Sequence, residues 1–160
     1  MKVIEIIGKN YFGSYRNVRV GCRAIIIKDD LILMSYEKKT DQYMIPGGGL
    51  EEGENEIECV KREIQEETGF IIDADECVLE IDEYYEDIKY VNKYFFGKIT
   101  ADGETKLTAE EKEVGLEPRW VKIQDILSIY SKHELYRDSD EMRRGMYLRE
   151  YTALMYLMNL

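Results

Sequence analysis

The stretch REIQEETGF, residues 62–70, places three carboxylates within about two helical turns. Glu63, Glu66 and Glu67 are three and four residues apart, so on a helix they share one face. Like charges at this spacing repel each other and reduce helix stability. The alternatives are a solvated acidic surface or a site in which a cation lies among the carboxylates. Hard divalent cations such as magnesium bind oxygen ligands of this kind.

The residues around these carboxylates follow a longer pattern, G-x5-E-x7-R-E-U-x-E-E-x-G-U, in which U is an aliphatic or bulky apolar residue. No position departs from it, and a chance match in a chain of this composition has a probability on the order of 10⁻⁶. The segment strongly resembles the Nudix box, the signature of the Nudix hydrolase family. The matching residues are Gly48, Glu54, Arg62, Glu63, Ile64, Glu66, Glu67, Gly69 and Phe70.

Strands and one helix are predicted to position the box, residues 48–70. Residues 18–36 are rich in β-branched side chains and read as two strands joined at Asp29-Asp30. Residues 42–54 read as a short strand that breaks into a glycine loop. From Asn55 to Thr68 an apolar stripe at helical spacing predicts a helix, with Gly69 as its C-terminal stop.

The second half of the chain predicts further strands and then helices. Residues 77–87 and 89–100 read as two strands with a tight connection around Asp87. A polar loop leads to a short strand at 119–123 and a helix near 124–130. A last helix is expected from about Asp140, and its apolar stripe is interpreted as packing against the sheet. That stripe consists of Tyr147, Leu148, Tyr151, Leu154, Met155 and Met158.

Strands and helices mix without strict βαβ alternation, which predicts an α+β sandwich. The order of strands before the box and the segment PRWVKIQDIL after it also resemble the Nudix family. The resemblance therefore implies the Nudix fold, a mixed β-sheet sandwiched between helices (an α/β/α sandwich). We expect one Nudix hydrolase domain over residues 1–160.

The resemblance also implies roles for the box residues. Glu66 and Glu67 would ligate Mg²⁺ or Mn²⁺, and Glu63 would ligate the metal or act as a base. A backbone carbonyl, that of Gly47 or Gly48, would join them, and glycine permits the close approach that this requires.

Other charged residues of the region have different expected roles. By helical count Arg62 points away from the carboxylates, and it is expected to pair with Glu54 and hold the loop to the helix, as in relatives. In some relatives the general base is a glutamate of a later loop. Here Glu110, Glu111 and Glu113 qualify, with Glu113 preferred and Glu111 second.

Residues that contact the substrate are less well marked. Stacking of a base on a tyrosine and contact of an arginine or lysine with phosphate or ribose are the expected interactions, with Arg23, Tyr43 and Tyr85 as the chosen candidates. The marks of the coenzyme A, NADH and ADP-ribose subfamilies are missing, and a tyrosine pair after the box weakly favours dinucleoside polyphosphates. The further candidates are Tyr36, Tyr84, Lys93 and Tyr94.

The predicted function is metal-dependent hydrolysis of the diphosphate bond in a small nucleoside diphosphate derivative. A non-hydrolytic sensor of the Nudix type is the alternative, but this chain keeps the box carboxylates and shows no basic helix-turn-helix. The formal net charge of −11 disfavours nucleic-acid polymers as partners. Removal of a 5′ diphosphate from RNA is disfavoured for the same reason.

Composition limits the location of the chain. Its 160 residues contain three cysteines without CxxC spacing, which fits a reducing compartment. No apolar run approaches the roughly 20 residues that span a bilayer, and Glu5 interrupts the first apolar stretch. We therefore expect a cytoplasmic protein with a small-molecule nucleotide as its partner. A homodimer with an exchanged N-terminal strand is also compatible with the sequence, and His133 is expected at the surface.

Overall fold

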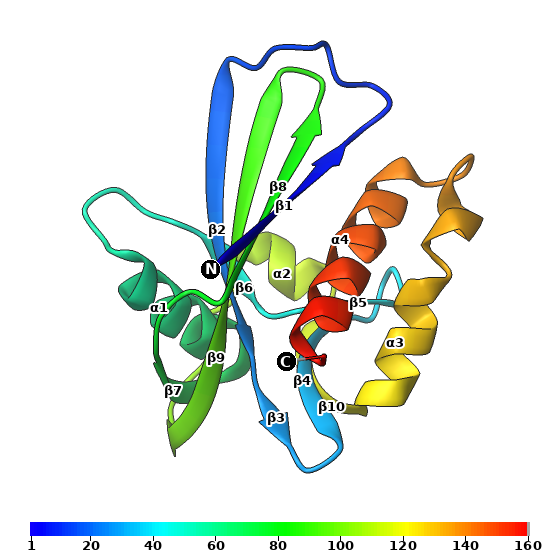
Figure 1. The fold of residues 1–160 in the computed structure, drawn as a ribbon. Coiled ribbons are helices and arrows are strands. Elements are labelled where there is room, and N and C mark those ends of the chain that lie inside the picture. Colours follow the sequence, from blue (N-terminus) through cyan, green and yellow to red (C-terminus); the bar gives the residue numbers. More distant parts are fainter. Residues whose placement is uncertain (160) are drawn as a thin grey trace.

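A computed structural model describes residues 1–159, and its strands and helices are drawn in Figure 1. In chain order they are β1 (Lys2–Ile7), β2 (Asn17–Ile25), β3 (Ile27–Lys28), β4 (Leu31–Glu37), β5 (Gln42–Met44), β6 (Gly47–Gly49), α1 (Glu56–Thr68), β7 (Phe70–Ala74), β8 (Leu79–Tyr85), β9 (Ile88–Asp102), α2 (Ala109–Glu113), β10 (Leu116–Lys122), α3 (Ile123–Ser131), the 3₁₀ helix η1 (His133–Tyr136) and α4 (Glu141–Leu157).

The strands form two mixed or antiparallel sheets. The larger has the order β1-β8-β9-β2-β6, with β7 paired to the second half of β9. Its β1–β8 and β2–β9 pairs are parallel, and its β8–β9 and β2–β6 pairs are antiparallel. The smaller has the order β10-β4-β3, with β5 on β4. β1 thus pairs with β8 of its own chain.

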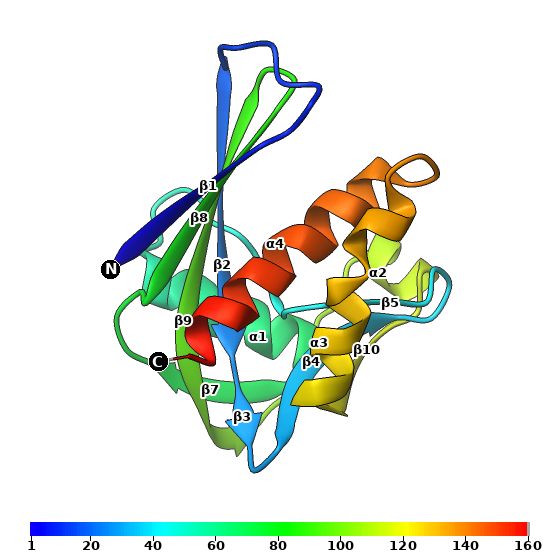
Figure 2. The same cartoon turned by 45° about the vertical axis from the view of Figure 1, so that its right-hand side comes forward.

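Helices cover both faces of this arrangement, as Figures 1 and 2 show, with α1 on one side and α3 and α4 on the other. Each side has its own buried cluster. Alternate residues of β2 serve the two clusters, because side chains along a strand point to opposite faces. Cys22 and Ala24 join α1, whereas Ile25 joins α3 and α4. The predicted α/β/α sandwich is confirmed.

Helix α1 begins and ends where the sequence predicts. The Asn55 side chain accepts from the backbone N–H of Glu58, and the Glu58 side chain accepts from the N–H of Asn55, which forms a capping box. Gly69 ends the helix with φ of 81°, in the left-handed region that glycine adopts readily. The box carboxylates therefore lie on a helix with defined ends.

The structure differs locally from the sequence-based expectations at four places. The triglycine expected to be a loop is strand β6, because its backbone pairs with Gly21 to Arg23 of β2. The strand β7, which starts directly after Gly69, and the short helix α2, which Thr108 caps, were not predicted. His133 is half-buried against the ring of Tyr151 rather than fully at the surface.

None of the helices within residues 1–159 has both the length and the apolar character that crossing a bilayer requires.

Candidate active site

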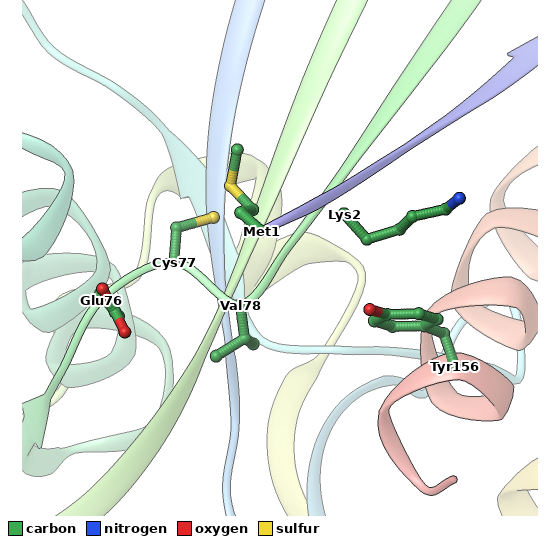
Figure 3. Close-up of a pocket in the computed structure, with 6 residues that line it drawn as sticks. All are labelled: Met1, Lys2, Glu76, Cys77, Val78 and Tyr156. Carbon is green, nitrogen blue, oxygen red and sulfur yellow. The ribbon is translucent and has the colours of Figure 1, made fainter. Parts of the chain in front are cut away.

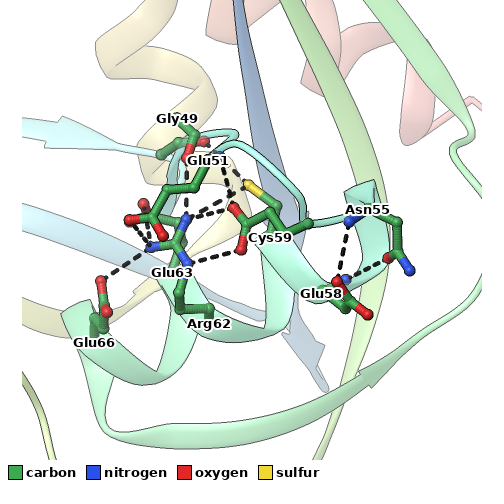
Figure 4. Close-up of polar contacts among 10 residues, drawn as sticks. Gly49, Glu51, Asn55, Glu58, Cys59, Arg62, Glu63 and Glu66 are labelled. Atoms are coloured by element: carbon green, nitrogen blue, oxygen red, sulfur yellow. Dashed lines mark hydrogen bonds and ion pairs between the residues drawn. The ribbon is translucent and has the colours of Figure 1, made fainter.

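The guanidinium of Arg62 lies at the centre of a carboxylate cluster beside α1 (Figure 4). Its Nε and Nη2 donate to the two oxygens of Glu54, at 3.0 and 2.7 Å. Its Nη1 donates to Glu63 Oε1 at 2.9 Å and to Glu66 Oε2 at 3.2 Å. An oxygen of Glu51 lies 3.7 Å from the same nitrogen. One positive charge is thus shared among four carboxylates.

The prediction that Arg62 points away from the carboxylates is wrong. A helical count gives the direction of the Cα–Cβ bond, but the long arginine side chain carries its guanidinium back over Glu63 and Glu66. The expected pair with Glu54 is present, and Arg62 also donates to the carbonyl of Gly49 at 3.0 Å. Hydrogen bonds from Arg62 lower the pKa of Glu54 to about 2.

Glu63 packs directly against the triglycine strand. A Cβ atom added to Gly48 would overlap the Glu63 carboxylate, so only glycine leaves room for that group. Loss of hydration raises the pKa of Glu63, while the charge of Arg62 opposes this and the charge of Glu66 adds to it. Cys59 donates from Sγ to the Gly48 carbonyl at 3.7 Å. The Gly48 backbone and the Glu63 carboxylate therefore lie side by side.

Glu67 is held differently from the other box carboxylates, since no arginine or lysine contacts it among the described residues. Its Oε2 accepts from Ser35 Oγ at 3.0 Å and from the backbone N–H of Gly47 at 3.2 Å. Loss of hydration raises the pKa of Glu67 to about 8, and the negative charge of Glu63 contributes. A cation at this position would relieve that penalty.

The donor set fits a hard divalent cation. Glu63 and Glu66 already converge on one positive nitrogen of Arg62, and Glu67 lies beside them as a carboxylate without a positive partner. As the side chains stand, no group of three or more His, Cys, Asp or Glu residues within 1–159 is arranged to hold a metal ion. Metal binding at the carboxylates therefore requires that these side chains move from their present positions.

Helix α2 brings one of its glutamates towards the cluster. Glu111 caps its own helix, accepting from the N–H of Thr108 at 2.9 Å, and its charge raises the pKa of Glu63. Glu113 is exposed and forms an ion pair with Lys39 at 3.2 Å. The charge of Glu111 therefore acts on a box carboxylate, whereas Glu113, the residue preferred from the sequence, is paired with Lys39.

A cleft of about 440 Å³ opens between the large sheet and α4. Its apolar walls include Met44, Tyr85, Tyr90 and Met146, and its polar lining includes Arg23 and Arg149. Arg23 connects the cleft to the box, because its Cα and Cγ lie against Gly47 and its charge also lowers the pKa of Glu67.

The Tyr85 ring is supported on two sides by glycines. A Cβ at Gly8, just after β1, or at Gly145, in α4, would overlap this ring or its hydroxyl. The Tyr85 hydroxyl donates to Glu83 at 3.3 Å. Of the predicted substrate contacts, Arg23 and Tyr85 therefore line one cleft.

Tyr43 and the weaker candidates lie elsewhere. The Tyr43 ring packs on that of Tyr36, with centroids 4.6 Å apart, outside the cleft lining. Tyr94 is fully buried and cannot stack on a base, and Lys93 is paired with Glu56 at 2.5 Å.

Buried charges that the sequence did not reveal lie beneath the cleft. Arg149 Nη1 donates to Glu83 Oε1 at 3.1 Å, and Arg149 Nε donates to Glu150 Oε1 at 2.9 Å. Asn92 Nδ2 donates to Glu83 at 3.0 Å, and Arg23 Nε donates to Asn92 at 3.4 Å. The only sequence signal for this network was the pair of charges at 149 and 150 within an otherwise apolar stretch of helix.

Another hollow, shown in Figure 3, lies at the start of β1 and is lined by Met1, Lys2, Cys77 and Tyr156, among others. It includes none of the box residues and none of the predicted substrate contacts.

Comparison with known proteins identifies the family. The NUDIX domain model matches residues 16–144, and the chain belongs to this family. The comparison with curated proteins gives no match. The predicted family and its class of enzyme, a Nudix hydrolase, are thereby confirmed.

Solved structures share the fold. A NUDIX hydrolase from Nitrosomonas europaea superposes with a TM-score of 0.58 at 23% identity, covering 82% of this chain and 88% of that chain. A MutT protein from Bacillus halodurans gives a TM-score of 0.55 at 25% identity over 69% of this chain and 72% of its own. An ADP-ribose pyrophosphatase from Streptococcus suis gives 0.50 at 16% identity over 67% and 75%.

Proposed function

We propose that this protein hydrolyses the diphosphate bond of a small nucleoside diphosphate derivative with the help of Mg²⁺ or Mn²⁺. The observation that carries the proposal is the excess of carboxylates at the box. In the part of the chain that the structure describes, Arg62 alone faces four of them and no arginine or lysine contacts Glu67. A divalent cation balances this charge and attracts the phosphates of a substrate.

The metal ligands in this proposal are the carboxylates of Glu63, Glu66 and Glu67 and the backbone carbonyl of Gly48. When bound, the metal supplies polarisation of phosphoryl oxygens and a lower pKa for water. The structural residues of the box are Glu54, Arg62 and Gly69, which join the preceding loop to α1 and end the helix.

Glu63 is the proposed proton acceptor for the attacking water. Its carboxylate lies against Gly48, and its raised pKa brings it nearer to neutrality than that of an ordinary glutamate. Glu113 was the other candidate from the sequence, and its exposure and its pair with Lys39 support a smaller role. The charge of Glu111 supports the raised pKa of Glu63.

The cleft between the sheet and α4 is the proposed site of the nucleoside. Arg23 spans the distance from the cleft to Gly47, so its guanidinium is suited to a phosphate or ribose oxygen, and Tyr85 offers an aromatic edge. Nucleoside triphosphates, dinucleoside polyphosphates and nucleotide sugars or ADP-ribose are the proposed substrate range. The name of the Streptococcus suis relative supports including ADP-ribose. The free cysteines Cys22, Cys59 and Cys77 support a cytoplasmic location.

The test is phosphate release from a nucleotide panel, with Mg²⁺ or Mn²⁺ and a coupled phosphatase. We expect Glu67→Gln to lower kcat by at least roughly 100-fold, with an unchanged circular dichroism spectrum. Glu63→Gln should cause a loss of about 10²- to 10⁴-fold, and Glu113→Gln a smaller one. Glu52→Gln is the matched control, since Glu52 is an exposed glutamate in the loop before α1.

Full activity in Glu67→Gln would exclude the proposed metal site. Tight metal-independent binding of a nucleotide without turnover by the wild-type protein would favour the sensor instead.

A further inference from the structure

The linker between β5 and β6, residues 45–46, leads directly into the triglycine strand beside the box. Its first residue, Ile45, is fully buried. The Ile45 N–H donates to Glu150 Oε2 at 2.8 Å, and the Ile45 carbonyl accepts from Arg23 Nη1 at 3.0 Å. Both backbone groups of a buried residue are thus bound by side chains from α4 and β2.

The remaining polar groups of the linker continue this chain of contacts towards the metal site. The carbonyl of Pro46 accepts from the N–H of Ala24 at 3.0 Å. The next N–H, that of Gly47, donates to Glu67 Oε2 at 3.2 Å. Only one residue, Pro46, therefore lies between the residue whose N–H is held by Glu150 and the residue whose N–H contacts a proposed metal ligand.

Glu150 is itself held rigidly. Its side chain is 0% exposed, and its Oε1 accepts from Tyr94 Oη at 2.7 Å and from Arg149 Nε at 2.9 Å. Burial opposes its ionisation, but the charges of Arg149 and Arg23 outweigh burial and lower the pKa of Glu150. The carboxylate is therefore an anion held in one position. Its Oε1 binds Tyr94 and Arg149, and its Oε2 binds the linker at Ile45.

Docking of α4 alone does not require such a group. A buried ion pair is frequently no more stabilising than well-packed apolar side chains of the same volume. An apolar residue could not replace the hydrogen bonds of Glu150, and among these the bond to the N–H of Ile45 is the one that reaches the linker; without it this N–H would be a buried unpaired donor.

We propose that Glu150 is a positioning residue for the metal site. By binding the N–H of Ile45, it fixes the linker so that the N–H of Gly47 meets Glu67 and the backbone of Gly48 meets Glu63. This inference rests on the proposed function for its catalytic meaning. Glu150 lies outside the region that matches the family, which ends at residue 144.

The test compares Glu150→Gln with Tyr94→Phe. Glutamine has the same size but a single acceptor oxygen, so it cannot serve both the Ile45 side and the Arg149 side. Tyr94→Phe removes one bond to Glu150 but leaves the bond to Ile45. Glu150→Asp, which keeps the charge but is shorter, is a second variant in case the glutamine protein does not fold.

The first readout is amide hydrogen exchange at residues 45–49, followed without metal or substrate. We expect exchange there to be at least about 10-fold faster in the Glu150 variants, with the centre of α1 unchanged. In Tyr94→Phe we expect wild-type exchange at 45–49 even if the protein is less stable overall. Equal acceleration in both types of variant, or none in either, would overturn the proposal.

The second readout is the dissociation constant for Mn²⁺, measured by calorimetry. We expect it to rise about 10- to 100-fold in the Glu150 variants and to stay at the wild-type value in Tyr94→Phe. Unchanged Mn²⁺ binding in the Glu150 variants would overturn the link to the metal site. If wild-type protein binds no Mn²⁺ and hydrolyses no nucleotide, the proposed function fails, and the exchange data alone decide whether Glu150 positions the linker.

Discussion

The protein contains two groups of carboxylates, one at the box and one beneath the cleft, and their charges are balanced differently. At the box, Arg62 is the one positive partner that residues 1–159 provide for Glu51, Glu54, Glu63 and Glu66. Beneath the cleft, Glu83 and Glu150 share Arg149, with Arg23 nearby.

We call the second group the closed network, because each of its carboxylates is paired with an arginine and accepts further hydrogen bonds from Asn92, Tyr85 or Tyr94. The first group, which includes Glu67 and which we call the open group, is left with excess negative charge. Loss of hydration is the main cause of the raised pKa of Glu67, and the negative charge of Glu63 adds to it. An excess of charge within a folded site indicates that something positive is missing. The comparison therefore separates a structural network from the proposed cation site.

The largest expected loss of stability comes from removing the arginine of the closed network. Arg149→Met should leave Glu83 and Glu150 buried without their cation and lower the free energy of unfolding by about 3–5 kcal/mol. Arg62→Met, the corresponding change at the box, should cost about 1 kcal/mol or less, because its partners remain partly solvated. Urea denaturation of both variants measures the difference. Equal losses would contradict the distinction between the two groups.

Adding metal should raise the free energy of unfolding through the open group only, that is, through the carboxylates of the box. Mg²⁺ at about 100 times its dissociation constant should raise the free energy of unfolding by about 2.7 kcal/mol, since it binds the folded state alone. Removal with EDTA should reverse the gain. Glu67→Gln should lose most of this stabilisation, and Tyr94→Phe, altered in the closed network, should keep it. Thermal denaturation with NaCl of equal ionic strength as the control measures the effect.

The pH dependence of the metal-free protein tests the comparison at a single residue. The folded pKa of Glu67 is about 8 and lies above its ordinary value of 4.5. The folded state thus binds more protons than the unfolded state between these values, and stability should fall as pH rises from about 5 to 8. In Glu67→Gln this part of the slope should vanish. A wild-type stability that rises over this range to the same extent as the variant would refute it.

The sequence was sufficient to predict the box because its chemistry needs particular residue types at fixed spacing on a single helix. Asn55 and Gly69 set the ends of that helix through local rules. The direction of Arg62 was missed because spacing along a helix does not determine where a long side chain ends. Gly47–Gly49 looked like a loop because the partner strand, β2, is distant in sequence.

The closed network could not be predicted for a related reason. Glu83, Asn92 and Arg149 come from β8, β9 and α4, and each alone resembles an ordinary polar or charged surface residue. Their burial depends on how α4 packs on the sheet, which no local pattern encodes. The two fully buried groups of Ile45 likewise become visible only once β2 and α4 are in place.

The contact between Gly8 and Tyr85 links the N-terminal segment to the cleft but not to the box. The cleft and the box can therefore change independently. The family match begins at residue 16, so the segment that carries Gly8 lies outside the matched region. It makes no contact with Arg62 or the box carboxylates within the described structure, but it backs one wall of the cleft. Under the proposed function, substitutions or length changes in this segment would therefore reshape what the cleft accepts and leave the box carboxylates unchanged.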